Sequence, residues 1–358
     1  MKIDSKSSER IALLRFPMII GIVFIHAYGS NHKFIGGQIN LVSTGFFAQL
    51  IQDLLSQGVA RLAVPMFFLI SGYFFFLGLN WSISNYKKQI IKRFKSLVVP
   101  FLFWNLIVLI AYIAIQEIPA MHNMLSGDKQ KILTYNMMEL LNTFFGFTQY
   151  PIAYQFWFIR DLIIISIASP IVYYMVKKAP FAYILVLLAL WLIDYWPIYI
   201  PSLASLLFFS IGAFLAINHI SFFKYDHYGK VMLSIYILVL ILDVLTKRLW
   251  FSQYVHHVGI LFGLMSVLYL TSILQKTSAI KKILLSLSGF SFFVFAFHEP
   301  LLLGLKKAAY KIFSPQSDLL ITTLYFACPI IVVLISMGVY LGVRNVAPKF
   351  LAITTGGR

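Results

Sequence analysis

Residues 11–29 read IALLRFPMIIGIVFIHAYG, and this stretch decides the fold. A transmembrane helix needs about 20 mostly apolar residues, so the stretch is long enough to cross a bilayer. It lacks the small-residue cleavage site of a signal peptide, and we expect it to remain as a first span. Composition extends this conclusion to the whole chain. Of 358 residues, 60% are hydrophobic and 11% are charged, less than half of the roughly 25% charge of soluble proteins.

Nine further apolar windows follow, and every backbone polar group of a lipid-exposed segment must be satisfied internally. The sequence therefore predicts an all-α integral membrane protein, a single bundle of about ten transmembrane helices within one domain over residues 1–358. The windows are 11–29, 58–79, 97–116, 156–176, 181–197, 200–217, 231–246, 258–275, 283–304 and 319–343.

Loop charge predicts the orientation of these spans. With both termini inside, the inner segments carry more than twice as many Lys and Arg residues as the outer segments. This places a basic cytoplasmic loop at 80–96 and a long periplasmic or extracellular loop at 117–155, with a short amphipathic helix at 132–142. The three lysines at 306, 307 and 311 fit an outer loop poorly, and an interfacial helix is the alternative. The net charge of +17 thus reflects topology rather than nucleic-acid binding.

Two ionisable residues lie inside the first span, where charge is costly. Arg15 and His26 are eleven residues apart, which places them on nearly one helix face with a rise of about 16 Å. An Arg near the inner surface suits a phosphate-bearing ligand, and a buried His suits general-base catalysis. The alternative is that Arg15 extends to the interface and His26 bonds a neighbouring helix.

Metal and disulfide chemistry have little support in the sequence. The pair His256-His257 lacks further ligands at useful spacing, so we expect no metal. Cys328 is the single cysteine, which excludes a disulfide within the chain.

Five motifs follow one another along the chain. They are RFPMIIGIVFIH (15–26), VPMFFLISGYF (64–74), KRFKSLVVP (92–100), QFWFIRDL (155–162) and FHEP (297–300). In content and order they resemble the signatures of the membrane-bound acyltransferase family 3, including its Arg-x10-His first span. One departure concerns the basic loop, where the family usually has two Arg three residues apart and this chain has Arg93 and Ser96. Lys92 or Lys95 supplies a point charge there but not the bidentate fork of Arg.

The resemblance implies an O-acyltransferase that moves an acyl group, most often acetyl, from cytoplasmic acyl-CoA to a sugar hydroxyl on the opposite side of the membrane. The expected co-substrate is acetyl-CoA or another acyl-CoA, and the expected acceptor is a cell-envelope or exported polysaccharide or its lipid-linked precursor. The expected location is the cytoplasmic membrane of a bacterium, with the lipid bilayer as the surrounding partner. The acyl group, the hydroxyl and the oligomeric state stay open.

Residue roles also come from the resemblance. The catalytic set is His26, as general base or transient acyl carrier, with Ser71, His298 and Glu299. The acyl-CoA set is Arg15, Lys92 and Arg93, and the substrate set is Trp157, Arg160 and Asp161.

Three of these roles have structural alternatives. The Ser71-Gly72 pair could serve only close helix contact. Arg160 and Asp161 could position a helix, and Trp157 could belong to the aromatic belt or the core.

Two other functions compete with the enzyme. A transporter or flippase for a lipid-linked sugar or acyl donor would have the same number of spans, but it predicts inverted repeats that the sequence does not show. An inactive relative that assists polysaccharide export is the third interpretation.

Overall fold

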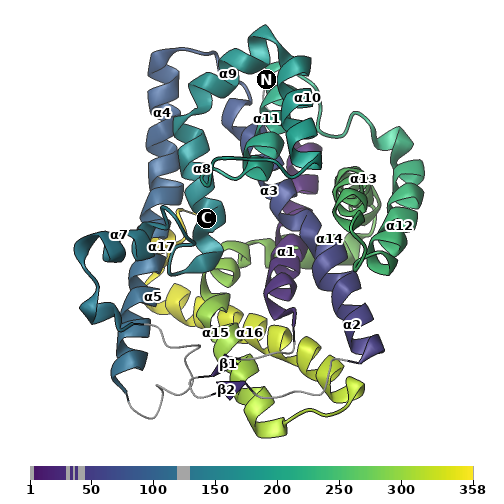
Figure 1. The fold of residues 1–358 in the computed structure, drawn as a ribbon. Helices are drawn as coiled ribbons and strands as arrows, with labels where there is room; N and C mark the ends of the chain where they lie inside the picture. Colours follow the sequence, from purple (N-terminus) through teal and green to yellow (C-terminus); the bar gives the residue numbers. More distant parts are fainter. Residues whose placement is uncertain (1–3, 30–32, 35–36, 39–44, 119–129, 358) are drawn as a thin grey trace. The chain divides into compact units, whose positions relative to one another are not determined.

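The computed structural model describes residues 4–29, 33–34, 37–38, 45–118 and 130–357 (Figure 1). Within these ranges the chain is almost entirely helical. The strands β1 (Lys33–Phe34) and β2 (Gly37–Gln38) pair antiparallel and are two residues long each. The prediction of helices in the apolar windows is confirmed.

Six helical stretches in the described part of the chain are long and apolar enough to cross a bilayer. They are Ser5–Ala27, Phe46–Phe76, Ile83–Glu117, Asp226–Leu245, Ser252–Leu274 and Asp318–Val346. Two bent helix pairs also pass the test, giving up to eight spans: Tyr154–Ile167 with Ser169–Lys178, and Ser278–Ser288 with Ser291–Phe313. The two remaining windows coincide with shorter helices, Pro180–Leu192 and Leu203–Ile217. The protein is therefore a multi-pass membrane protein, while the count of ten and the orientation stay predictions.

The chain forms two compact units, each assembled from separate stretches of sequence. The first comprises Met1–Ile22, Gly58–Val98 and Phe158–Ser291, and the second comprises Val23–Gln57, Val99–Trp157 and Phe292–Arg358. Helices that lie in or begin beside the first unit's stretches are α3 (Ala63–Phe76), α4 (Ile83–Arg93), α8 (Trp157–Ile167), α9 (Ser169–Lys178), α10 (Pro180–Leu192), α11 (Leu203–Ile217), α12 (Gly229–Leu245), α13 (Ser252–Leu274) and α14 (Ser278–Ser288). Those of the second are α2 (Phe46–Gln52), α5 (Val99–Glu117), α7 (Met137–Phe145), α15 (Ser291–Phe313), α16 (Asp318–Val346) and α17 (Pro348–Thr354). Helix α1 (Ser5–Ala27) contributes residues to both.

Much of the segment predicted as a basic loop, 80–96, is helical. Helix α4 begins at Ile83, where the Ser82 hydroxyl accepts the backbone N–H of Asn85, and it continues through a π-helical turn, Phe94–Val98, into α5. Lys and Arg have good helix propensity, so a charge count alone does not separate a loop from a helix.

The segment 117–155 contains a 3-10 turn, Ile132–Thr134, followed by α7. The predicted amphipathic helix is therefore present but begins several residues later than expected. A capping box sets this start, because Asn136 and Glu139 each bond the other's backbone N–H (2.9 and 2.8 Å). Residues 119–129 of the predicted loop lie outside the described part.

Helices α3 and α11 pack against each other in the first unit with their backbones in close contact. A Cβ atom at Gly72 would lie 2.0 Å from the Phe209 carbonyl oxygen, and one at Gly212 would lie 2.0 Å from that of Leu69. Either methyl group would overlap the facing backbone, so both positions require glycine. Such small-residue contacts are typical of helix pairs in membranes.

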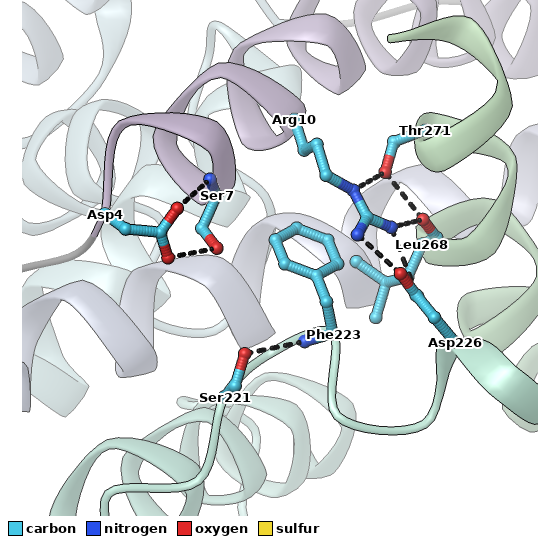
Figure 2. Close-up of polar contacts among 8 residues, drawn as sticks. All are labelled: Asp4, Ser7, Arg10, Ser221, Phe223, Asp226, Leu268 and Thr271. Carbon is cyan, nitrogen blue, oxygen red and sulfur yellow. Dashed lines mark hydrogen bonds and ion pairs between the residues drawn. The ribbon is translucent and has the colours of Figure 1, made fainter. Parts of the chain in front are cut away.

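The first unit also contains a partly buried ion pair near the start of α1. The guanidinium of Arg10 donates to both carboxylate oxygens of Asp226, with 3.1 Å from Nη2 to Oδ1 (Figure 2). Its Nε donates to Thr271 Oγ1 (2.8 Å), and Nη2 donates to the Leu268 carbonyl (2.7 Å). The Phe223 ring lies beneath, 3.6 Å from the guanidinium carbon. Arg10 therefore joins α1 to α13 and to the segment before α12.

Asp4 caps the same end of α1. Its Oδ1 accepts the backbone N–H of Ser7 and its Oδ2 accepts the Ser7 hydroxyl, both at 2.8 Å (Figure 2). These bonds hold the pKa of the Asp4 carboxyl below its usual value. The Asp4 cap thus marks the start of the first helix, and the Arg10 ion pair connects that helix to its neighbours.

In the second unit, an indole and an aromatic cluster connect α5, α15 and α17. The Trp104 Nε1–H donates to the Thr354 carbonyl at 3.0 Å. Its ring packs edge-on against Phe293 and Phe297, with centroids 5.6 and 6.2 Å away. The α15 segment that carries the FHEP motif is therefore held against α5.

Candidate active site

The FHEP motif lies at a break in α15. Glu299 leaves the helical conformation, with φ −113° and ψ 140°, and Pro300 follows it. Pro300 has no backbone N–H, so the Ala296 carbonyl loses its helical donor. The side chain of Gln155 replaces that donor, because its Nε2 lies 3.2 Å from Ala296 O and 3.3 Å from Glu299 O. The Gln155 amide thus donates to buried carbonyl groups that the helix break would otherwise leave without partners.

The His298 side chain bonds two further backbone carbonyls of α15. Its Nδ1 lies 2.7 Å from the Phe295 carbonyl oxygen and 3.2 Å from that of Val294. A ring nitrogen that faces two carbonyl oxygens carries the proton, so the hydrogen-bond network assigns the Nδ1–H tautomer. His298 is fully buried, and its position is fixed by these bonds.

Three segments of the second unit meet around His26, the penultimate residue of α1. The His26 ring packs edge-on against Tyr154, with centroids 4.9 Å apart, and lies 5.3 Å from the His298 ring. The Tyr154 hydroxyl donates to Glu299 Oε1 at 2.8 Å. The fold thus brings His26 together with His298 and Glu299, which follow it by more than 270 positions and were predicted in the same catalytic set. His26 is half-buried, whereas Glu299 is 3% exposed.

Lys306 holds the end of α1 that carries this imidazole. Its Nζ donates to the Ala27 carbonyl at 2.7 Å and lies 3.3 and 3.5 Å from the carbonyl oxygens of Tyr28 and His26. The last carbonyls of a helix have no partner within it, and a cation there also complements the helix dipole. Lys306 is 6% exposed and lies within α15, so the outer-loop lysine of the sequence prediction is a buried helix residue.

A second set of bonds fixes the last turn of α1 from the segment after α2. Ser56 Oγ donates to the Phe24 carbonyl (2.5 Å) and lies 2.7 Å from the Tyr325 hydroxyl. The Tyr28 hydroxyl donates to Asp53 Oδ1 at 2.9 Å. The backbone around His26 is therefore restrained on several sides.

The residues predicted to bind acyl-CoA lie in the stretches of the first unit. Arg15 is exposed on α1, and Lys92 is exposed on α4. Arg93 donates from Nη2 to the Ser71 carbonyl at 3.1 Å, and its guanidinium lies 5.4 Å from the Phe75 ring centroid. The cofactor role of these cations stays a prediction.

Ser71 also lies in the first unit, on α3. Its neighbour Gly72 is required for the close contact with α11, which favours the packing role that the Ser-Gly pair could have. The proposed catalytic role of the Ser71 hydroxyl stays a prediction.

Arg160 and Asp161 form a buried pair that positions α11. Asp161 Oδ2 accepts the Ser202 backbone N–H (2.8 Å) and the Ser205 hydroxyl (3.1 Å) at the start of that helix. Arg160 Nη2 lies 3.3 Å from Asp161 Oδ1. These contacts support the helix-positioning alternative, and a sugar-binding role stays a prediction. Trp157, predicted with them, lies with its ring centroid 6.5 Å from that of Tyr150.

Three residues of the site were not identified from the sequence: Tyr154, Gln155 and Lys306. Tyr154 and Gln155 are uncharged: Tyr154 directly precedes the QFWFIRDL motif, and Gln155 is its first residue. Within that motif, the residues predicted to bind substrate were Trp157, Arg160 and Asp161. Lys306 gave a signal, since its charge fitted the predicted outer loop poorly. Across the described ranges, no group of three or more His, Cys, Asp and Glu residues could hold a metal ion.

The end of α1 thus places the His26 ring beside Tyr154, whose hydroxyl bonds the Glu299 carboxyl group. A family model described as an acyltransferase domain matches residues 9–339, and the chain belongs to this acyltransferase family. The predicted membership is thus confirmed, and the protein is an O-acyltransferase by family.

One curated relative is the protein named "Succinoglycan biosynthesis protein ExoH" from Rhizobium meliloti (strain 1021). It is 25% identical over 364 residues, which cover 99% of this chain and 94% of the relative. No solved structure matches the chain.

Proposed function

We propose that this protein transfers an acyl group from cytoplasmic acyl-CoA to a hydroxyl of an exported or cell-envelope polysaccharide or its lipid-linked precursor. The observation that carries the proposal is the cluster of His26, Tyr154, His298 and Glu299 at the end of α1. The relative's name supports a polysaccharide acceptor. Acetyl is the first acyl group to test, and succinyl is the second.

His26 acts as the general base in this proposal. It removes the proton of the sugar hydroxyl while the hydroxyl oxygen attacks the thioester carbonyl carbon. The carbon–sulfur bond then breaks, and CoA leaves as a thiolate that takes up the proton from His26. The products are the sugar ester and free CoA.

The membrane topology explains how donor and acceptor meet. We infer ten spans with both termini in the cytoplasm of a bacterium, with α10 and α11 as the two short spans. Arg15 then lies toward the cytoplasm, about 16 Å along α1 from His26. The sequence spacing of a cation and a base along α1 is comparable to the length of an extended pantetheine arm, which supports acyl-CoA as the donor.

The test is release of free CoA and transfer of labelled acyl groups by the purified protein in nanodiscs, with envelope glycans as acceptors. We expect His26→Ala to lose at least about a hundredfold in rate, in the range of a positioned general base. His219→Asn is the matched control, because His219 is exposed and has φ 56°, a conformation that Asn tolerates.

Two results would contradict this function. A His26→Ala variant as fast as wild type would exclude the base. If the wild-type protein moves lipid-linked sugars across a vesicle membrane but releases no CoA, it is a transporter. In the same assay Arg15→Ala should raise the KM for acyl-CoA more than it lowers kcat, and an unchanged KM would remove Arg15 from the donor site.

A further inference from the structure

Within the part of the chain that the structure describes, three buried oxygen or nitrogen atoms around the α15 break have no hydrogen-bond partner. They are Gln155 Oε1, His298 Nε2 and Glu299 Oε2. The three residues are 2%, 0% and 3% exposed, respectively. A buried polar atom without a partner costs about 1–3 kcal/mol, so three in one place call for an explanation.

The chemistry of the three atoms is the same. His298 donates from Nδ1, so its Nε2 is a lone-pair acceptor in the neutral ring. Gln155 donates from Nε2 to two carbonyls, which fixes its amide orientation and leaves Oε1 as an acceptor. Glu299 accepts the Tyr154 hydroxyl at Oε1, and in the ionised form of this carboxyl group Oε2 is a further acceptor. A ligand that binds these three acceptors must supply hydrogen-bond donors. The ionised phosphates of CoA have only acceptor oxygens, so they are excluded as this ligand.

The set adjoins the proposed base. The ring of His298 lies 5.3 Å from that of His26, and Tyr154 contacts both the His26 ring and the Glu299 carboxylate. Backbone bonds from Gln155 and His298 hold the break itself in place, so the acceptors are pre-positioned.

We propose that Gln155, His298 and Glu299 form a subsite that binds the neighbouring hydroxyl groups of the acceptor sugar and places the reacting hydroxyl at His26. This assignment rests on the proposed function and assigns the acceptor a site. His298 and Glu299 then bind and orient the sugar, whereas His26 alone exchanges the proton.

Binding is measured without acyl-CoA, by saturation-transfer NMR titration of methyl β-D-glucopyranoside and methyl β-D-galactopyranoside against the protein in nanodiscs. Glu299→Gln keeps an oxygen for the Tyr154 hydroxyl but turns the other acceptor into a donor. We expect it to weaken glycoside binding about tenfold, since the site then lacks a partner for a substrate hydroxyl. The control His219→Asn should bind as wild type does.

His298 offers a pair of variants that separates binding from structure. Asn places an amide N–H where Nδ1 was and removes the Nε2 acceptor, whereas Gln reaches the Nε2 position and gives up the bond to Phe295. The subsite predicts weaker glycoside binding for His298→Asn than for His298→Gln. A purely structural role predicts the reverse order, parallel to the order of their thermal stabilities.

Monodeoxy glycosides provide the final measurement. Loss of one hydroxyl should weaken binding to wild type about tenfold but change binding to Glu299→Gln less than threefold, because its partner is already gone. Equal losses in both proteins, or no glycoside binding by wild type, would overturn the subsite. If the protein binds glycosides but releases no CoA, the subsite stands and the acyltransferase function is rejected. If the protein transfers acyl groups but Glu299→Gln and His298→Asn bind glycosides as wild type does, the function stands and the subsite is rejected.

Discussion

Replacing Lys306 with Met tests whether the end of α1 must be held for His26 to work. Met has a similar length but no donor, so the variant loses the bond to Ala27 O at 2.7 Å and the longer contacts to Tyr28 O and His26 O. One strong bond and two longer contacts from a charged donor contribute about 2–4 kcal/mol. Removing a buried ammonium recovers part of this energy, so we expect a net loss of stability of only about 1–2 kcal/mol.

The expected effect on catalysis is larger. A displacement of about 1 Å in a catalytic group can cost a hundredfold in rate. We therefore expect kcat to fall about 30- to 100-fold, which corresponds to about 2–2.7 kcal/mol in the activation barrier. The KM for acyl-CoA should stay within a factor of about two, because the hydrogen bonds of Lys306 go to the end of α1.

The assay combines thermal unfolding in detergent with acyl transfer in nanodiscs. Lys306→Arg, which keeps a cationic donor, should recover part of the activity. Lys311→Met is the control, since Lys311 is exposed and lies on the same helix. A Lys306→Met protein with a kcat within threefold of wild type would refute the positioning role, whatever its stability.

Two further predictions concern the first unit. Asp226→Asn removes the charge that pairs with Arg10, so we expect a loss of about 1–3 kcal/mol in stability. In a double-mutant cycle, the variant that combines it with Arg10→Met should lose less stability than the sum of the two single variants. Additive losses would contradict the coupling. Gly72→Ala places a methyl 2.0 Å from Phe209 O and should destabilise by several kcal/mol. A methyl at Gly304 meets no atom of the described residues within 4 Å, so Gly304→Ala should be neutral or stabilising in the same thermal assay.

Hydropathy predicted where the helices are but not where they break. The window 156–176 contains two helices, α8 and α9, bent by 63° around Ala168. An apolar run indicates that a segment is buried in lipid, but it does not indicate whether the helix changes direction within that segment. Pro170, at the second position of α9, was the available signal, since Pro is favoured in the first turn of a helix.

The sequence identified those residues of the site whose ionisable side chains are energetically costly to bury in a membrane. His26, His298 and Glu299 stood out because ionisable groups are rare in spans. Gln155 did not, because an amide that satisfies the Ala296 carbonyl acts through geometry that only the fold creates. For the same reason Asp161 was grouped with substrate binding, although its carboxylate caps a helix.

The break in α15 also has a consequence for the order of synthesis. Glu299 carries a carboxylate into a span, and an acidic residue at a helix centre costs a few kcal/mol on insertion scales. Its partner Tyr154 and the carbonyl-binding Gln155 both precede it in the chain, as does His26. When α15 leaves the ribosome, the groups that receive its polar residues have already been made. Moving this helix to the N-terminal half by circular permutation would remove that advantage, and we expect such a chain to insert poorly.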